Sequence, residues 1–241
     1  MLTDAHAHIA DKEVINILKE YNIYTTACAM SPDECIFVES LSKQDPSRVI
    51  PTYGLHPWNS SSYTVDQMMP YLQKCIAIGE IGMDNVWCEV PLDIQRKVFI
   101  QQLDIAAQRG VPVILHTKGK EKEIAEIIEN YKIPVLVHWY SCENYLDMYL
   151  NKGYYFSIGP DIHKEKAVQK VAATVPIDRI LIETDGIEGI AWAIDKPATS
   201  KDIPSSLKTT LESVAKLRGI EPSALQTQVN ENWQRLFKKI D

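Results

Sequence analysis

The sequence predicts an α/β fold: a single-domain (β/α)8 TIM barrel that spans residues 1–241 and carries an additional C-terminal helix. Apolar runs of strand length alternate eight times with helix-like segments, and this alternation implies parallel strands joined by right-handed crossovers. The length of 241 residues is typical of one such barrel. An open doubly wound sheet is the alternative, but no G-x-G-x-x-G dinucleotide-binding pattern follows the first apolar run.

The predicted strands are short apolar runs bounded by polar or turn residues. They lie at residues 2–9, 23–29, 49–55, 75–81, 111–116, 134–139, 153–158 and 179–184. Helix-like segments lie between them, among them 11–21, 91–110, 120–131 and 142–153. The last three of these have apolar residues at i, i+3, i+4 and i+7, as amphipathic helices do. The segment 221–239 is predicted to be the C-terminal helix and to cap the barrel.

Charge and cysteine content exclude several classes of protein. The formal net charge is −7, so the chain lacks the basic footprint of proteins that bind nucleic acid stably. Five cysteines are scattered without C-x-x-C spacing, which is typical of free thiols in a reducing compartment. No signal peptide precedes the first predicted strand, and no apolar run is long enough to cross a membrane. We therefore expect a cytoplasmic protein without membrane association or a stable nucleic-acid complex; its protein partners are unknown.

Histidines and carboxylates gather where the predicted strands end. Residues spaced by two share one face of a strand, so Asp4, His6 and His8 should face the same way. Further such residues lie in, end or follow later strands: His56, Glu80, His116, His138 and Asp185. In a (β/α)8 barrel the carboxyl ends of the strands converge on one rim, where the chemistry is done. Of the six histidines, only His163 lies elsewhere.

This set predicts a metal centre. Each residue alone has a structural explanation, since a buried histidine or acid can simply be hydrogen-bonded in the core. Helices hold most of the residues, however, and a random distribution would place histidines there too. Four imidazoles and two carboxylates at one rim suit one or two divalent metal ions, with Zn, Mn or Mg as candidates. The predicted ligands are His6, His8, Glu80, His116, His138 and Asp185.

The chain resembles the TatD-type hydrolases, a branch of the amidohydrolase-like metal-dependent barrels often described as deoxyribonucleases. The matching motifs run almost from end to end: DAHAH, YGLHPW, IGEIGMD, VILHT, VHWYS, GYYFSIG, DRILIETDG and the terminal NENWQRLF. The resemblance implies a two-metal centre. In such a centre one ion would be held by His6, His8, Glu80 and Asp185, and the other by Glu80, His116 and His138, with Glu80 as the bridge.

A centre of this kind would hydrolyse its substrate with a metal-activated water, because bound cations acidify water and hold phosphoryl oxygens. Asp185 is the candidate general base; its alternative role is that of a ligand only. His56 and Lys118 are the candidate substrate-binding residues, with a structural loop role and a solvated surface position as the respective alternatives. Lys120 is a second lysine that could pair with a phosphate, again with a solvated surface position as the alternative.

Other side chains are expected around this centre. Asp4 should support the histidines of the first strand rather than bind metal. Four tryptophans lie in loops predicted at the same mouth, where they could stack a base or sugar ring or simply pack the loops. They are Trp58, Trp87, Trp139 and Trp192.

Three segments depart from the TatD pattern, and each lacks an anion-binding group. Trp58 stands where the family commonly has a second histidine, and TKGK follows His116 in place of an arginine-bearing continuation. Residues 186–206 lack the basic stretch that the family often has there. Arg is the residue best suited to bidentate phosphate binding, so these differences weaken DNA as a substrate but leave hydrolysis intact.

The sequence therefore predicts a metal-dependent hydrolase of phosphoester bonds that acts on a small molecule or a nucleic-acid end. One alternative keeps the metal centre but cleaves an amide, ester or lactone. The other is a catalytically weak barrel that acts as an interaction protein.

Overall fold

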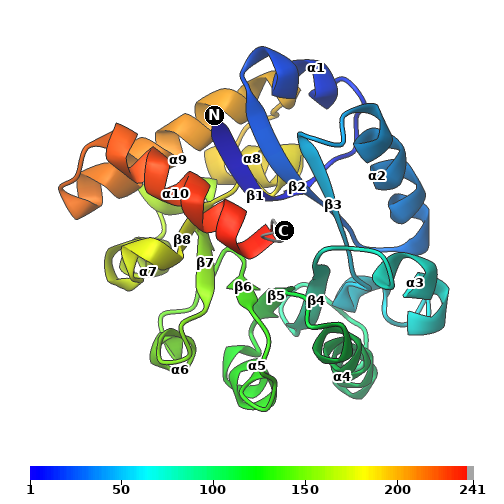
Figure 1. The fold of residues 1–241 in the computed structure, drawn as a ribbon. Coiled ribbons are helices and arrows are strands. Elements are labelled where there is room, and N and C mark those ends of the chain that lie inside the picture. The colour runs from blue at the N-terminus through cyan, green and yellow to red at the C-terminus, as the bar shows by residue number, and fades with distance from the viewer. Residues whose placement is uncertain (238–241) are drawn as a thin grey trace.

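The computed structural model describes residues 1–237 and contains eight parallel strands in a ring, surrounded by helices (Figure 1). The strands are β1 (Leu2–His8), β2 (Ile23–Ala29), β3 (Val49–Tyr53), β4 (Ile78–Asp84), β5 (Val113–Lys118), β6 (Val135–Val137), β7 (Tyr155–Ile158) and β8 (Ile180–Ile182). They follow one another around the sheet in chain order. This order confirms the predicted (β/α)8 barrel and excludes the doubly wound sheet, whose strand order reverses.

Each strand is followed by a helix, and the first seven of these helices lie on the outside of the ring (Figure 1). These helices are α1 (Val14–Glu20), α2 (Pro32–Gln44), α3 (Val65–Leu72), α4 (Leu92–Arg109), α5 (Glu121–Ile128), α6 (Leu146–Leu150), α7 (Lys166–Thr174) and α8 (Gly186–Ile194). Two further helices, α9 (Ile203–Arg218) and α10 (Pro222–Phe237), complete the described chain. The sequence prediction contains α10 but lacks α9. Residues 238 and 239, the predicted end of the C-terminal helix, lie outside the described residues.

Strand β4 differs most from its predicted position, because it begins and ends three residues later than 75–81. The amide of Cys75 donates to the carbonyl of Tyr71, so this residue still belongs to the turn that ends α3. At the other end the strand continues beside β5 until Asp84 pairs with Lys118. The shift moves Glu80 from near the end of the strand toward its middle, with residues on both sides held by pairing.

Helix α10 crosses the amino ends of β1 and β8 (Figure 1). The indole of Trp233 is fully buried and donates to the hydroxyl of Thr26 on β2 at 2.9 Å. The side-chain amide of Asn232 donates to the carbonyl of Ile180 at 2.8 Å. The helix therefore caps the end of the barrel opposite the predicted site.

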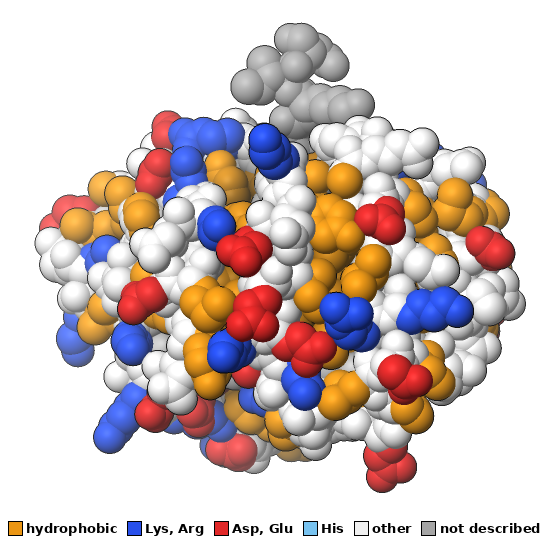
Figure 2. Space-filling model, turned by 90° about the horizontal axis from the view of Figure 1, so that it is seen from below, with side chains coloured by type: hydrophobic (Ala, Val, Ile, Leu, Met, Phe, Trp, Pro, Cys, Tyr) orange, Lys and Arg blue, Asp and Glu red, His pale blue; other side chains and the backbone are white. Residues whose placement is uncertain are grey.

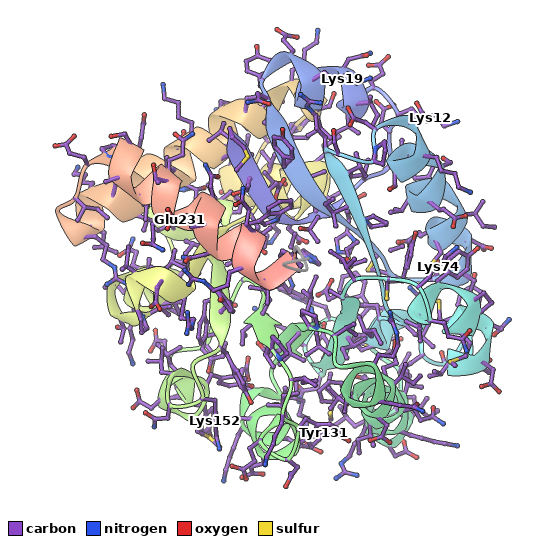
Figure 3. All side chains as sticks on the ribbon, viewed as in Figure 1. Lys12, Lys19, Lys74, Tyr131, Lys152 and Glu231 are labelled. Carbon is purple, nitrogen blue, oxygen red and sulfur yellow. The ribbon has the colours of Figure 1, made fainter. Side chains whose placement is uncertain are left out.

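The ring of strands and the layer outside it are filled by side chains, whereas charged residues such as Lys19 and Lys152 lie on the outer rim (Figure 3). All five cysteines are free thiols. Within residues 1–237, no helix has both the length and the apolar character that crossing a bilayer requires.

Candidate metal centre

The two histidines of β1 converge at the carboxyl end of the barrel. The Nε2 atoms of His6 and His8 lie 3.2 Å apart. Asp185 joins them from the end of β8, with its Oδ1 at 3.3 Å from His6 Nε2 and 3.5 Å from His8 Nε2. Glu80 joins them from β4, with its Oε2 at 3.3 Å and 3.1 Å from the same two nitrogens. These four side chains form the first group of potential ligands.

A second group lies on the other side of Glu80. Its Oε1 is 2.7 Å from His116 Nδ1 on β5 and 2.8 Å from Nε2 of His138, which follows β6. Each oxygen of one carboxylate thus faces a different pair of imidazoles. The side chain of Glu80 is only 2% exposed, so it is held between the two groups and away from solvent.

The backbone places Asp185 through close contact between the β8 and β1 ends. The amide of Asp185 donates to the carbonyl of His6 at 3.1 Å. Gly186 follows with φ of +79°, and a Cβ at this position would overlap the carbonyl oxygen of His8. Glycine is therefore required here both for its conformation and for its lack of a side chain. The TDG sequence is what allows the Asp185 carboxylate to reach the histidines.

Asp4 supports this junction and not the histidine rings, which corrects the sequence prediction. Its carboxylate accepts hydrogen bonds from the amide of Thr184 at 3.0 Å and from the Thr184 hydroxyl at 2.7 Å. Burial raises the pKa of Asp4 to about 7 despite these bonds. Asp4 therefore links β1 to Thr184, the residue that follows β8 by two positions and precedes Asp185. Its carboxylate bonds to this neighbouring segment instead of the histidine rings on its own strand.

The imidazoles and carboxylates of the centre shift one another's pKa values. Burial alone raises the pKa of Glu80, but the charge of His138 and the hydrogen bonds from His116 and His138 hold it well below its usual range. Burial and His138 lower the pKa of His6, yet Asp185 and Glu80 outweigh them and raise it to about 9. Protons thus balance the carboxylates in the metal-free protein, and cations bound between these groups would replace those protons.

Two carboxylates that the sequence prediction lacks orient the second group. Asp84 Oδ2 lies 3.0 Å from His116 Nε2, and Glu183 Oε1 lies 3.1 Å from His138 Nδ1. Each of these carboxylates keeps a proton on the ring nitrogen that faces it, so a cation that displaced the proton facing Glu80 would meet the lone pair of the other nitrogen. Both acids stand in quoted motifs, IGEIGMD and LIETDG, but no spacing rule pairs them with their histidines.

This arrangement fits the divalent cations that the sequence predicts. Unprotonated imidazole nitrogens and carboxylate oxygens are the donors that zinc and manganese accept in proteins. The carboxylate partners of His116 and His138 are those that typically orient metal-bound histidines.

His56 is also part of this cluster, although the sequence assigns it to substrate binding. Its Nε2 is 3.5 Å from Glu80 Oε1, and its Nδ1 accepts a hydrogen bond from the amide of Trp58 at 3.3 Å. Burial lowers the pKa of His56 to about 4, so the ring is neutral and the proton stays on Nε2. A donor at this atom is suited to an oxygen of a substrate and unsuited to a metal ion.

A cavity of about 400 Å³ opens from the centre to the surface. The four predicted tryptophans all line it: Trp58, Trp87, Trp139 and Trp192. Lys118 also lines it; its ammonium donates to the hydroxyl of Ser141 at 3.1 Å and lies 4.2 Å from the centre of the Trp87 ring. Lys120 does not line it, because this lysine turns to the surface beside α5 and pairs with Glu123 at 3.6 Å. Lys120 therefore takes the solvated surface position, not the phosphate-binding one.

A buried acid fixes one tryptophan wall of this cavity. Asp161 follows β7, and its Oδ1 accepts a hydrogen bond from the indole of Trp139 at 2.7 Å. Gly159 and Gly189 pack directly against the same indole, where any Cβ would overlap the ring or come very close to it. The sequence prediction lacks Asp161, because its partner lies 22 residues away on a different loop.

Replacing Glu183 by Gln is expected to weaken metal binding about 10- to 100-fold while leaving the fold intact. The amide is isosteric, but it no longer holds the His138 ring with a charged acceptor, and loss of such a partner typically has this effect. Titration of the metal-free variant with zinc against a competing chelator measures the change. Glu188→Gln, at an exposed carboxylate on the cavity rim, is the control and should bind zinc as the wild type does.

Comparison with known proteins gives consistent results over the whole chain. The family model for TatD related DNases matches residues 3–238. The chain is 25% identical to the metal-dependent hydrolase YabD of Bacillus subtilis, covering 99% of both chains. It is 27% identical to the 3'-5' ssDNA/RNA exonuclease TatD of Yersinia pseudotuberculosis, covering 95% of this chain and 93% of the relative. The crystal structure of YJJV, a TatD homologue from Escherichia coli, superposes with a TM-score of 0.85 at 19% identity, covering 99% and 98% of the two chains.

Proposed function

Because this chain belongs to the family of TatD related DNases, we propose that it is a metal-dependent hydrolase that cleaves phosphoester bonds at the centre built around Glu80. The observation that carries the proposal is that the two oxygens of the Glu80 carboxylate face different pairs of histidines. Glu80 Oε2 faces His6 and His8, while Oε1 faces His116 and His138. One buried acid between two pairs of imidazoles supports two adjacent positions for divalent cations.

The proposed ligands follow from these two groups. His6, His8, Glu80 and Asp185 would hold one ion, and Glu80, His116 and His138 would hold the other. Zn, Mn and Mg remain the candidate metals. Bound there, the ions would acidify a water molecule and neutralise the oxygens of a phosphoryl group.

Asp185 is the proposed general base. Its side chain is 24% exposed, whereas that of Glu80 is 2% exposed, so Asp185 contacts both the histidines of β1 and the open cavity. A carboxylate in this position can take the proton of an attacking water as the bond to phosphorus forms. His56 is proposed to donate a hydrogen bond from its Nε2–H to a substrate oxygen.

The cavity supports a small substrate, or the end of a longer one. Its volume of about 400 Å³ is at the lower end of the range for small-molecule sites. Within the described part of the chain, Lys118 is the one Lys or Arg that lines it, which suits recognition of a single phosphate. Basic and acidic side chains are mixed on the side of the barrel that Figure 2 shows, and the formal net charge of −7 gives no general attraction for a nucleic-acid strand. We therefore propose a small phosphodiester or a terminal nucleotide as the substrate.

A second candidate function is hydrolysis of a carboxylic ester, amide or lactone with the same centre. The observation that favours it is the shortage of cations, since most of the charged groups that line the cavity beside the histidines are acids: Glu80, Asp161, Asp185 and Glu188. A neutral substrate would lie among the tryptophan walls without an unpaired charge.

Turnover of a substrate panel by metal-loaded protein separates the two functions. We expect bis(p-nitrophenyl) phosphate and short oligonucleotides to be cleaved faster than ester and amide substrates, and chelation to abolish the activity. Lys118→Met should lower kcat/KM about 10-fold for a phosphodiester and leave a neutral ester unaffected, because only the phosphodiester is charged. Lys120→Met is the matched control and should change neither rate. Faster cleavage of neutral esters than of any phosphodiester would favour the second function.

A further inference from the structure

A buried thiol lies beside the first group of potential ligands. Cys28 stands near the end of β2, directly beside His8 of β1 in the register of the sheet, and is only 1% exposed. Its Sγ belongs to a group in which the donor atoms of His6, His8, Cys28 and Glu80 all lie within 4.8 Å of one another. The sequence prediction treats this residue only as one of five scattered thiols.

We propose that Cys28 supplies a thiolate ligand to the cation held by His6, His8 and Glu80, and so makes this position selective for thiophilic divalent metals. The inference rests on the proposed metal centre and adds a donor to it. As the bond from Sγ to the metal forms, the thiol proton leaves to solvent, so no oxidant or reductant is needed.

The distances are compatible with this role. Zinc binds thiolate sulfur at about 2.3 Å and imidazole nitrogen at about 2.1 Å, so two such donors in a tetrahedral site are about 3.6 Å apart. The group at Cys28 therefore needs a contraction of at most about 1.2 Å to enclose an ion. Rotation of the side chains toward a bound ion would provide a movement of this size.

The surroundings of Cys28 differ from those of an ordinary buried cysteine. A free cysteine in a core behaves as a small apolar side chain and lies among other apolar groups. Cys28 instead lies beside a carboxylate and two imidazoles. Cys35 and Cys75 are also buried, but no other cysteine among residues 1–237 belongs to a group of potential metal ligands. A sulfur donor at this place favours zinc, cobalt or cadmium over magnesium and manganese.

X-ray absorption at the zinc edge of the zinc-loaded protein tests the proposal directly. We expect a sulfur scatterer at about 2.3 Å that is lost in Cys28→Ser and retained in Cys35→Ser, the control at a buried cysteine on α2. The cobalt-loaded protein should show a thiolate-to-cobalt charge-transfer band with the same dependence on Cys28. The preference for zinc over manganese, measured by competition, should fall about tenfold in Cys28→Ser.

The outcomes separate this inference from the proposed centre. Zinc bound by the wild-type protein with only nitrogen and oxygen scatterers would overturn the thiolate ligand and leave the metal centre standing. Failure of the wild-type protein to bind zinc at all would overturn both. The absorption spectrum of the wild-type protein decides the question even if Cys28→Ser does not fold.

Discussion

Replacing Glu80 by Gln is expected to lower kcat/KM by at least about 10³-fold, which corresponds to about 4 kcal/mol of lost transition-state stabilisation. The carboxylate contacts His6 and His8 with Oε2, and His116, His138 and, at 3.5 Å, His56 with Oε1. The amide keeps the shape but removes the charge and places an N–H₂ group toward one of the two pairs. Both proposed ions lose a ligand, so bound metal should fall together with activity.

Metal content and steady-state kinetics on the same preparation measure this effect, and circular dichroism shows whether the barrel is intact. Glu121→Gln is the matched control, because Glu121 is also buried but accepts a hydrogen bond from the amide of Gly119, away from the centre. It should keep its metal and its activity within about twofold, as is usual for a substitution outside the site. A Glu80→Gln protein with full metal content and normal turnover would contradict the assignment of Glu80.

Replacing Asp185 by Asn should lower kcat by about 10²- to 10⁴-fold and reduce metal content much less. His6, His8 and Glu80 remain to hold the ion, whereas the amide can no longer accept a proton from the attacking water. The position of Asp185 at the cavity and beside both histidines is the basis of this expectation. Metal analysis and single-turnover rates at saturating metal separate the two contributions.

Glu188→Gln provides the control, since this residue lines the same cavity but is exposed and follows Asp185 by nearly one turn of α8. Its kcat should remain close to that of the wild type. If the rate loss of Asp185→Asn disappears when the metal concentration is raised, Asp185 is a ligand and not the base.

The barrel fold, and the end of the barrel at which the histidines gather, were predictable because both depend on the pattern of apolar residues along short segments of the sequence. Eight apolar runs and their intervening amphipathic segments define the barrel, since strands and helices need apolar faces of different period. His6 and His8 could be assigned to one face by their spacing of two, and His116 by its place at the end of an apolar run. Position along a strand was therefore sufficient to bring these residues to one rim.

The partners of these residues were not predictable from the same pattern. Asp84 and Glu183 orient His116 and His138 across gaps of 32 and 45 residues, and the sequence gives no rule that joins them. Asp4 was expected to support the histidines of its own strand but bonds to Thr184, 180 residues away. In each case the choice of partner depends on which strands are neighbours and on side-chain rotamers.

The sequence by itself determined the barrel, the rim at which the histidines and carboxylates gather, and the donor types that suit divalent cations. Only the tertiary structure decided that the two oxygens of Glu80 face different imidazoles, that His56 presents a proton, and that Cys28 lies among the first group of ligands. The physical reason is that periodicity fixes the face and end on which a residue lies. The distance between two donor atoms is set by the packing of strands that are remote in the chain.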